Sequence, residues 1–330
     1  MLFRSRHQTI KNIIEWRRFL AACGGSSNGF GGGDGSLSLG VTDAPVDDAD
    51  AVVVSFSGIQ LLNNQGGVAK DLTFDEPQQV DLLSQQGDQQ FFLIRDEPVP
   101  AGIYREVRLQ VEGMTNSSCN QALSNPDYPS YITVSGVDYP LIVPNGGSSG
   151  FKVKGPITIA AGGSAAYTVD FDLRKSIAER GATGCYNLRP VLRVVDNAQT
   201  GTLSGSVDPA LLADASCTSN PASGAGAAVY VFDGAGTIPD DFDGNDPEPL
   251  TTALLSPVVD DAQNVISFDY EVGFLLAGSY TVALSCQAAD DAPAPSDDAI
   301  GFIGAGDVLI EPNANTPFDF SAVAPVEEQV

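Results

Sequence analysis

The stretch Ser36-Leu37-Ser38-Leu39-Gly40-Val41 alternates apolar residues with small ones without interruption. Side chains of a β-strand point to opposite faces in turn, so this pattern predicts a strand with one buried face and one solvated face. A second run, residues 51–62 (AVVVSFSGIQLL), is rich in β-branched and other apolar residues and predicts another strand. The two runs together indicate an all-β protein.

Similar runs continue along the chain, separated by turns rich in glycine, proline and asparagine. They cover residues 90–94, 104–111, 131–134, 151–159, 165–171, 186–195, 201–207, 227–232, 266–275, 277–284, 298–309 and 318–322. A short helix fits residues 80–84 or 173–177. Because many short strands with frequent turns are typical of sandwiches, we expect two antiparallel β-sandwich domains in tandem. The expected domains are residues 36–196 and residues 197–322, with a tail at 323–330.

Charge supports the boundary between the two expected domains. The chain carries 16 Lys and Arg against 42 Asp and Glu, a net charge of −26 at pH 7. Arg193 is the last cation, and the 22 acidic residues of segment 194–330 face no Lys or Arg in their own segment. Such a field repels nucleic acid and anionic membrane surfaces and favours solubility in a salty medium. We therefore expect no nucleic-acid partner.

The N-terminal segment ends in Leu20-Ala21-Ala22-Cys23, which resembles a bacterial lipobox. The resemblance implies cleavage before Cys23 and a diacylglyceryl group on its sulfur. Gly24-Gly25-Ser26-Ser27 then reads as a flexible tether, and glycine directly after the cysteine implies the outer membrane. We expect a signal-like segment at 1–22, a lipidated Gly/Ser tether at 23–35, and an exported protein anchored by lipid, periplasmic or surface-exposed.

Four charged residues interrupt the apolar stretch of ~7–15 residues that a signal peptide needs before its cleavage site. They are Lys11, Glu15, Arg17 and Arg18. Two alternatives stay open: Met1 is not the true start, or export is inefficient. A third alternative is a cytosolic protein in which Leu-Ala-Ala-Cys occurs by chance. Cysteine usage and composition make this alternative the less favoured one.

The four remaining cysteines divide evenly between the two expected domains. Cys119 and Cys185 lie in the first, Cys217 and Cys286 in the second. Four cysteines allow three pairings, and only Cys119–Cys185 with Cys217–Cys286 respects the domain division. Each bridge closes a loop of roughly seventy residues, which contributes about 4 kcal/mol in the chain-entropy model. The alternative, four buried free thiols, fits an exported chain less well.

Some residues that commonly support catalysis are absent from the part of the chain that follows Cys23. The only histidine, His7, and the only tryptophan, Trp16, both precede Cys23. A chain cleaved there can build neither Ser-His-Asp nor Cys-His catalysis, nor a histidine metal site. Paired carboxylates could serve a glycosidase, but such clefts usually offer aromatic platforms, and the cleaved chain has no tryptophan. We therefore expect no enzymatic activity and no catalytic residue.

The run Asp241-Phe242-Asp243-Gly244-Asn245-Asp246 is the best candidate for a cation site. Oxygen side chains that alternate around a glycine turn suit Ca²⁺, which takes six to eight oxygen ligands. The spacing departs from an EF-hand, because Gly244 is the fourth residue and not the sixth. Two interpretations stay open: a solvated acidic loop, or a Ca²⁺ site formed by Asp241, Asp243, Asn245 and Asp246.

Further charged residues gather near predicted strands. We expect Asp43 to form an Asx turn before the following proline and to add surface charge. Asp170 and Asp172 share one face of a strand, and Arg174 and Lys175 follow directly. This arrangement favours structural ion pairs over a binding groove.

Four motifs of the first expected domain resemble the bacterial DUF4382 family, which is common in lipoproteins and has no assigned function. They are Thr42-Asp43-Ala44-Pro45, Pro100-Ala101-Gly102-Ile103-Tyr104, Asp170-Phe171-Asp172-Leu173-Arg174-Lys175-Ser176 and Arg189-Pro190-Val191-Leu192-Arg193. The resemblance spans residues 35–196. Residues 200–322, with Gly201-Thr202-Leu203-Ser204-Gly205-Ser206-Val207 and Gly278-Ser279-Tyr280, are similar to transthyretin-like or carboxypeptidase-regulatory-like sandwiches. Neither resemblance implies a catalytic residue, and some sandwiches of the second type bind carbohydrate.

These observations predict a non-catalytic envelope lipoprotein that acts as a binding or structural module, with a glycan or protein ligand. One alternative is an envelope component that assembles with itself or a partner by sheet-edge pairing. Another is a carbohydrate-binding accessory module. Tyr128, Tyr131 and Tyr139 form an aromatic cluster that suits corner packing or a surface patch for sugar or peptide.

Overall fold

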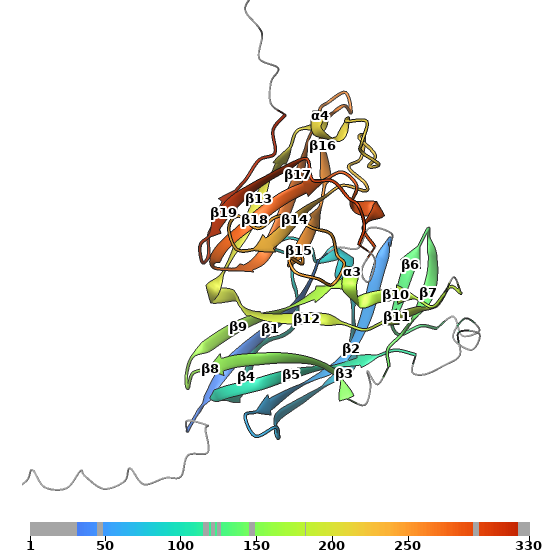
Figure 1. Cartoon of the computed structure of the whole chain (residues 1–330). Helices are drawn as coiled ribbons and strands as arrows, with labels where there is room; N and C mark the ends of the chain where they lie inside the picture. The colour runs from blue at the N-terminus through green and yellow to red at the C-terminus, as the bar shows by residue number, and fades with distance from the viewer. Residues whose placement is uncertain are drawn as a thin grey trace, which may run out of the picture.

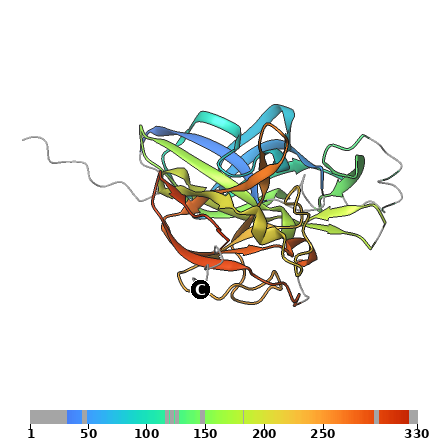
Figure 2. The same cartoon turned by 90° about the horizontal axis from the view of Figure 1, so that it is seen from above.

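A computed structural model describes residues 32–44, 49–114, 119, 123, 127–144, 149–181, 183–292 and 297–322. The described chain folds into β-strands joined by turns and a few single-turn helices, which confirms the all-β class. Figure 1 shows two sandwiches one above the other, the N-terminal one below, with the short α3 at their junction. In both views β6, β7, β10 and β11 project to one side of the lower sandwich (Figures 1 and 2).

The first sandwich consists of two sheets. The strands of the smaller sheet are β1 (Asp34–Ala44), β4 (Phe91–Pro100), β9 (Ser164–Asp172) and β12 (Val191–Asp196), in the order β12-β9-β1-β4. The strands of the larger sheet are β2 (Ala51–Asn63), β3 (Val68–Asp81), β5 (Gly102–Glu112), β6 (Tyr131–Val134), β7 (Val137–Ile142), β8 (Phe151–Ile159), β10 (Ile177–Glu179) and β11 (Tyr186–Leu188). Their order is β10-β11-β7-β6-β2-β5-β8, and β3 pairs with β2. Single turns of helix, η1 (Leu82–Ser84) and α3 (Leu173–Ser176), follow β3 and β9, where the sequence allowed them.

The second sandwich follows η2 (Asn197–Gln199) and consists of two four-stranded sheets. One holds β13 (Thr200–Val207), β16 (Ser256–Val259), β17 (Val265–Leu276) and β20 (Asn315–Pro317), in the order β16-β17-β13-β20. The other holds β14 (Ala228–Asp233), β15 (Thr251–Leu254), β18 (Gly278–Ser285) and β19 (Gly304–Ile310), in the order β15-β14-β18-β19. The helical turns α4 (Pro209–Leu212) and η3 (Ala288–Asp290) lie in the connections.

Both sandwiches use the same corner. In each, an Ala-Gly pair turns the chain from one sheet to the other, and a tyrosine two residues after the glycine closes the turn. The hydroxyl of Tyr104 donates to the backbone oxygen of Pro100, and that of Tyr280 donates to the backbone oxygen of Leu276 at 2.8 Å. Both rings are buried, so each corner satisfies its polar groups while it covers one end of a core.

Most strand pairs are antiparallel, as the sequence predicted, but three of the four sheets also contain one parallel pair each. β1 runs parallel to β9, β7 parallel to β11, and β13 parallel to β20. A parallel pair needs a long crossover connection, and here the remaining strands of each sandwich provide it. In both sandwiches the first strand lies between an antiparallel and a parallel neighbour, β4 and β9 in one, β17 and β20 in the other.

Each sandwich has a core of its own. Alternate residues of β1, such as Leu37, Leu39 and Val41, are fully buried, as their spacing predicts. The second core includes Val229 and Val231 of β14. β14 is also buried on its other face, where aromatic residues form a smaller cluster with the loop before β15. That face is turned toward the first sandwich, as the contacts below show.

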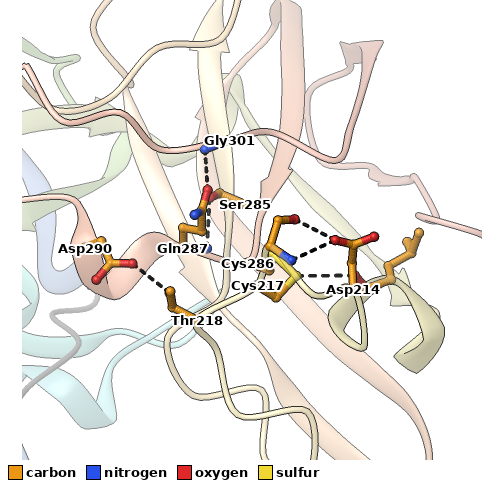
Figure 3. Close-up of a disulfide and its surroundings, with 10 residues drawn as sticks. Asp214, Cys217, Thr218, Ser285, Cys286, Gln287, Asp290 and Gly301 are labelled. Carbon is orange, nitrogen blue, oxygen red and sulfur yellow. Dashed lines mark hydrogen bonds between the residues drawn. A yellow bond between two sulfur atoms is a disulfide. The ribbon is translucent and has the colours of Figure 1, made fainter.

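Both predicted disulfides are present. Cys119 is bonded to Cys185 and Cys217 to Cys286. The second bridge ties the connection after α4 to the end of β18 (Figure 3). Thr218 next to it donates to Asp290 Oδ2 at 2.7 Å, so the bridge and a hydrogen bond fix the same loop.

Candidate functional site

The site begins with a single helical turn that projects from the first sandwich. Asp172, at the end of β9, accepts a hydrogen bond from the backbone N–H of Lys175 at 3.1 Å and so caps α3. Ser176 Oγ donates to the backbone oxygen of Asp172 and accepts from the N–H of Val191 at 2.9 Å. The turn is therefore held from both sides, and its two basic residues point toward the second sandwich.

Arg174 extends from this turn into the second sandwich, where it is only 4% exposed. Its Nη1 donates to the hydroxyl of Tyr230 at 3.1 Å and to Asp291 Oδ2 at 3.3 Å. The guanidinium also lies 5.3 Å from the ring centre of Phe242, close enough for a cation–π contact. A cation of one domain is thus buried among aromatic and acidic groups of the other.

The residues that receive Arg174 are already linked to one another. Tyr230 donates to Asp291 Oδ2 at 2.6 Å, and the backbone N–H of Phe242 donates to Asp291 Oδ1 at 3.0 Å. Burial raises the pKa of Asp291, although these donors and Arg174 oppose the shift. Burial likewise raises the pKa of Tyr230, so its proton stays on the hydroxyl and the tyrosine can donate. Tyr230 and Asp291 therefore form a preorganised pair of acceptors for the guanidinium of Arg174.

Lys175 makes a second contact beside the first. Its Nζ lies 3.0 Å from Glu248 Oε1 and donates to the backbone oxygen of Pro249 at 3.0 Å. It also lies 3.4 Å from Asp172 Oδ2 and 4.5 Å from the ring centre of Phe242. The ion pair expected within the first domain is present, but the same ammonium group also holds the second domain.

A second junction lies away from α3, in the loop after η1. The backbone N–H of Asp88 donates to Glu271 Oε1 at 2.7 Å. A Cβ added at Gly273 of β17 would lie 2.1 Å from the backbone oxygen of Gly87, so the two backbones touch without room for a side chain. Gly87 itself has φ of 65°, a conformation that glycine adopts readily. The sandwiches are thus joined at two places besides the connecting chain.

A cleft of about 600 Å³ lies beside the junction at Gly87 and is lined by both sandwiches. Residues of the first sandwich on its wall include Thr42, Asp43, Asp170 and Arg193, and residues of the second include Ser204, Ser206, Asp269 and Glu271. Arg193 Nε donates to Asp170 Oδ2 at 2.6 Å, as cross-strand neighbours on β12 and β9. The charged residues of the wall are therefore mostly acidic, and hydroxyl groups of Thr42, Ser204 and Ser206 lie on the same wall.

Asp43 differs from the other acidic residues of the wall. It is only 5% exposed, which corrects the expectation that it contributes surface charge. Its two carboxylate oxygens are buried without a well-formed hydrogen bond within the described part of the chain, and the donor that approaches them is the backbone N–H of Leu173. Burial raises the pKa of Asp43 well above its ordinary value, the carboxylates of Asp170, Asp172 and Asp81 raise it further, and the backbone N–H of Leu173 offsets this only in part. The expected Asx turn involves Pro45, which lies outside the described residues.

The four residues of the predicted Ca²⁺ site separate into two groups. Asp241 is buried and accepts a hydrogen bond from the backbone N–H of Asp298. Asp241, Asp291 and Asp298 can place one carboxylate oxygen each within 4.8 Å of one another. Asp243, Asn245 and Asp246 do not belong to that group.

The remaining three residues form a local turn. Asp243 Oδ1 accepts from the backbone N–H of Asn245 at 2.8 Å, and the hydrogen bonds from Asn245 lower the pKa of Asp243. Asn245 and Asp246 are exposed. Sequence reasoning identified Asp241, but its partners Asp291 and Asp298 lie about fifty residues further along the chain and carry no local spacing signal.

Other predicted residues fall outside the cleft. Cys23 lies outside the described residues, so the lipidation of Cys23 stays a prediction. His7 and Trp16 also lie outside the described residues. Tyr139 packs against Tyr186 with ring centres 5.8 Å apart, which is corner packing of the kind the sequence allowed. In the described part of the chain, no helix is long and apolar enough to span a bilayer.

Comparison with known proteins finds a family model that matches most of the first sandwich. Residues 34–190 match the model of the domain of unknown function DUF4382, and no curated protein matches the chain. Among solved structures, the chain is similar to a leucine-rich repeat protein from Bacteroides thetaiotaomicron, with 11% identity over 88% of this chain and 27% of that one and a TM-score of 0.22. It is also similar to the TIE protein of Bacillus anthracis, with 14% identity over 87% of this chain and 33% of that one and a TM-score of 0.16. The chain thus spans a third or less of these two proteins, and the family match is confined to residues 34–190.

Proposed function

We propose that this protein is a non-catalytic binding module of the cell envelope and that its ligand binds in the cleft between the two sandwiches. The observation that carries the proposal is the double junction. Contacts at α3 and at Gly87 hold the two sandwiches against each other, and both sandwiches line a cleft of about 600 Å³. Preformed cavities of this size at domain interfaces are common places for a ligand.

The chemistry of the described residues supports binding over catalysis. Their four cysteines are held in disulfides, which leaves no thiolate nucleophile in this part of the chain. Arg193 and Asp170 neutralise each other at 2.6 Å, and the hydroxyl groups of Ser204 and Ser206 are bonded to Asn315 and Asp319. Side chains held in this way are preorganised to receive a polar ligand such as a glycan or a peptide.

The edges of the sheets oppose the alternative of assembly by strand pairing. β3 lies at an edge of its sheet and carries Lys70, Asp71 and Pro77. β16, at an edge of its own sheet, contains Pro257. Charges and prolines on edge strands prevent pairing with another chain, so the cleft is the better candidate for recognition.

The N-terminal segment supports an envelope location. We propose that Cys23 carries a lipid and that residues up to the start of β1 form a tether that holds both sandwiches away from the outer membrane. The acidic composition suits an exterior medium.

Blocking the cleft tests the proposed function. Asp269 is exposed on β17 and lines the cleft, so Asp269→Trp fills it without entering a core. Ser267 lies two residues away on the same face of β17 and is not part of the wall, so Ser267→Trp is the matched control. A glycan array and a peptide array with the full mature chain should yield ligands whose binding falls at least about tenfold in Asp269→Trp and stays unchanged in the control. Ligands that bind both variants equally would place recognition elsewhere.

A further inference from the structure

We propose that Asp43 is a proton switch for the contact between the two sandwiches. With Asp43 neutral, the sandwiches are held together at both junctions, and with Asp43 ionised both junctions loosen. The inference concerns the coupling of the domains and holds whether or not a ligand binds in the cleft, so it goes beyond the proposed function. It rests on the position of Asp43 between the two junctions, on its burial and on the charges that face it.

The carboxyl group of Asp43 lies next to the start of α3, which forms the first junction. β1 runs parallel to β9, and Asp43 is the register partner of Phe171 near the end of β9. The backbone N–H of Leu173, the first residue of α3, approaches the carboxyl group of Asp43. The next two residues of this turn are the ones that bind the second sandwich. A change of charge at Asp43 therefore acts on the turn that joins the domains.

The backbone at the end of β1 holds the loop that forms the second junction. The N–H of Asp43 donates to the backbone oxygen of Gln85 at 3.0 Å. Thr42 Oγ1 lies 2.7 Å from the backbone oxygens of Gln85 and of Gln89. These contacts enclose Gly87, whose backbone touches that of β17. The end of β1 is thus connected to both places where the sandwiches meet.

The burial of Asp43 favours its neutral form. Its carboxyl oxygens are buried without a well-formed hydrogen bond within the described part of the chain. An ionised carboxylate in such a place loses its hydration without replacement, whereas a neutral carboxyl group loses much less. β15 of the second sandwich packs near the end of β1, and Asp43 belongs to the wall of the cleft between the sandwiches. Separation of the sandwiches therefore gives this group access to water, and its ionisation favours separation.

The anions that face Asp43 favour the neutral form as well. Three carboxylates of the first sandwich raise the pKa of Asp43: Asp170 and Asp172 of β9, and Asp81 at the end of β3. The loop after η1 and the far wall of the cleft on β17 add further carboxylates and no cation: Asp88, Asp269 and Glu271. β15 contains no charged residue. Ionisation of Asp43 would thus place one more negative charge among like charges.

The cations near Asp43 have partners of their own. Arg193 of β12 pairs with Asp170 at 2.6 Å. The two cations of α3, Arg174 and Lys175, are bound to carboxylates of the second sandwich. In the described part of the chain, a negative charge on Asp43 therefore gains a counterion only when one of these pairs breaks. Because two of the three pairs form the junction at α3, the ionised carboxylate competes with that junction.

The direction of the pH effect follows from proton linkage. Burial raises the pKa of Asp43 well above its ordinary value while the sandwiches are in contact. A hydrated aspartate in the separated form titrates near ~3.9. The contacting form thus binds the proton more tightly, and a rise in pH between the two pKa values favours separation. Each pH unit in this interval raises the ratio of separated to contacting molecules by up to about tenfold.

Calorimetry and small-angle scattering of the full mature chain test the switch from about pH 4 to about pH 9, a range that spans the ordinary and the raised pKa. As the pH rises, the single unfolding transition of the wild type should split into two, and its radius of gyration should increase. Asp43→Asn, which stays neutral, should keep one transition and a constant radius. Asp75→Asn is the matched control, because Asp75 is an exposed carboxylate of β3. The control should follow the wild type.

Hydrogen exchange of the wild type guards against a variant that does not fold. After correction for the intrinsic pH dependence of exchange, the amides of α3 and of the loop 85–89 should lose protection together, by at least about tenfold, as the pH rises. The amides of β5 in the core should keep theirs. A wild type with constant radius, transition and protection over the whole range would overturn the assignment. So would a pH dependence that persists in Asp43→Asn or disappears in Asp75→Asn.

Discussion

The contact of Arg174 with the second sandwich makes a direct prediction about how the two domains unfold. In the wild type the guanidinium is buried and joins Tyr230 and Asp291 across the junction. The substitution Arg174→Ala removes the cation and leaves both partners in place. We expect the substitution to uncouple the two sandwiches without damage to either core.

The expected loss of stability follows from the groups that Arg174→Ala leaves buried. Asp291 has a side chain with no exposed surface, and its remaining partners are one hydroxyl and one backbone N–H. Removal of one partner of a buried ion pair typically costs about 3–5 kcal/mol, because the other charge stays buried and uncompensated. The cation–π contact with Phe242 adds to this loss. We therefore expect Arg174→Ala to destabilise the folded chain by about 3–5 kcal/mol near neutral pH.

The effect should depend on pH in a defined direction. Burial already raises the pKa of Asp291, and loss of Arg174 raises it further because the charged form loses its counterion. A carboxyl group with a raised folded-state pKa binds its proton more readily in the folded state than in the unfolded state. Stability then falls as pH rises through the folded pKa. The deficit of Arg174→Ala should accordingly shrink as the pH is lowered toward that range.

Calorimetry of the full mature chain measures both effects. The wild type should unfold in one transition and Arg174→Ala in two. Below its first transition, Arg174→Ala should also have a larger radius of gyration than the wild type in small-angle scattering. Arg95→Ala is the control, since Arg95 is exposed and only stacks on Phe92 at 3.8 Å. Its effect should stay within about 0.5 kcal/mol. A single transition in Arg174→Ala at the temperature of the Arg95→Ala control would refute the role of Arg174 as the link between domains.

Three further predictions address other parts of the chain. Cys23→Ser should abolish membrane partitioning in the native host, and a variant that still partitions like the wild type would exclude the lipid anchor. Replacement of Cys217 and Cys286 by alanine opens a bridge with a sequence separation of 69 and should cost about 4 kcal/mol in denaturant unfolding; a loss below about 1 kcal/mol would contradict this. In denaturant unfolding at a series of pH values, stability should fall as pH rises through the raised pKa of Asp43, and Asp43→Asn should lack this decline.

The sequence predicted the parts of the fold that local patterns encode. Alternation located β1, β5 and β8, because one face of each is buried and the other is not. β3 was missed, since it is an edge strand in which Val80 alone is buried, and Pro77 follows soon after the short alternation around Leu72 and Phe74. The pairing of strands was predicted less well. The parallel neighbours of β1 and β13 come from distant parts of the chain, and nothing in either local pattern indicates them.

The candidate site was harder to predict for the same reason. Sequence reasoning noticed Arg174 and Lys175 but assigned both to ion pairs within the first domain. The partners of Arg174 lie 56 and 117 residues away, beyond any spacing rule. One signal was present: residues 228–232 of β14 (AVYVF) are five consecutive apolar or aromatic residues, which indicates a strand covered on both faces. A strand at the surface of an isolated sandwich would alternate instead.

The position of Arg174 also affects how the DUF4382 domain is to be studied. The segment that carries Arg174 and Lys175 is one of the motifs by which residues 34–190 resemble that family, yet its contacts are completed by the second sandwich. Without that sandwich, a guanidinium that is 4% exposed would be returned to water, and the cleft would lose one of its two walls. Binding to the first sandwich alone would therefore test a surface that the full chain does not present. If the cleft binds the ligand as proposed, the unit of recognition is the pair of sandwiches, because both of them line the cleft.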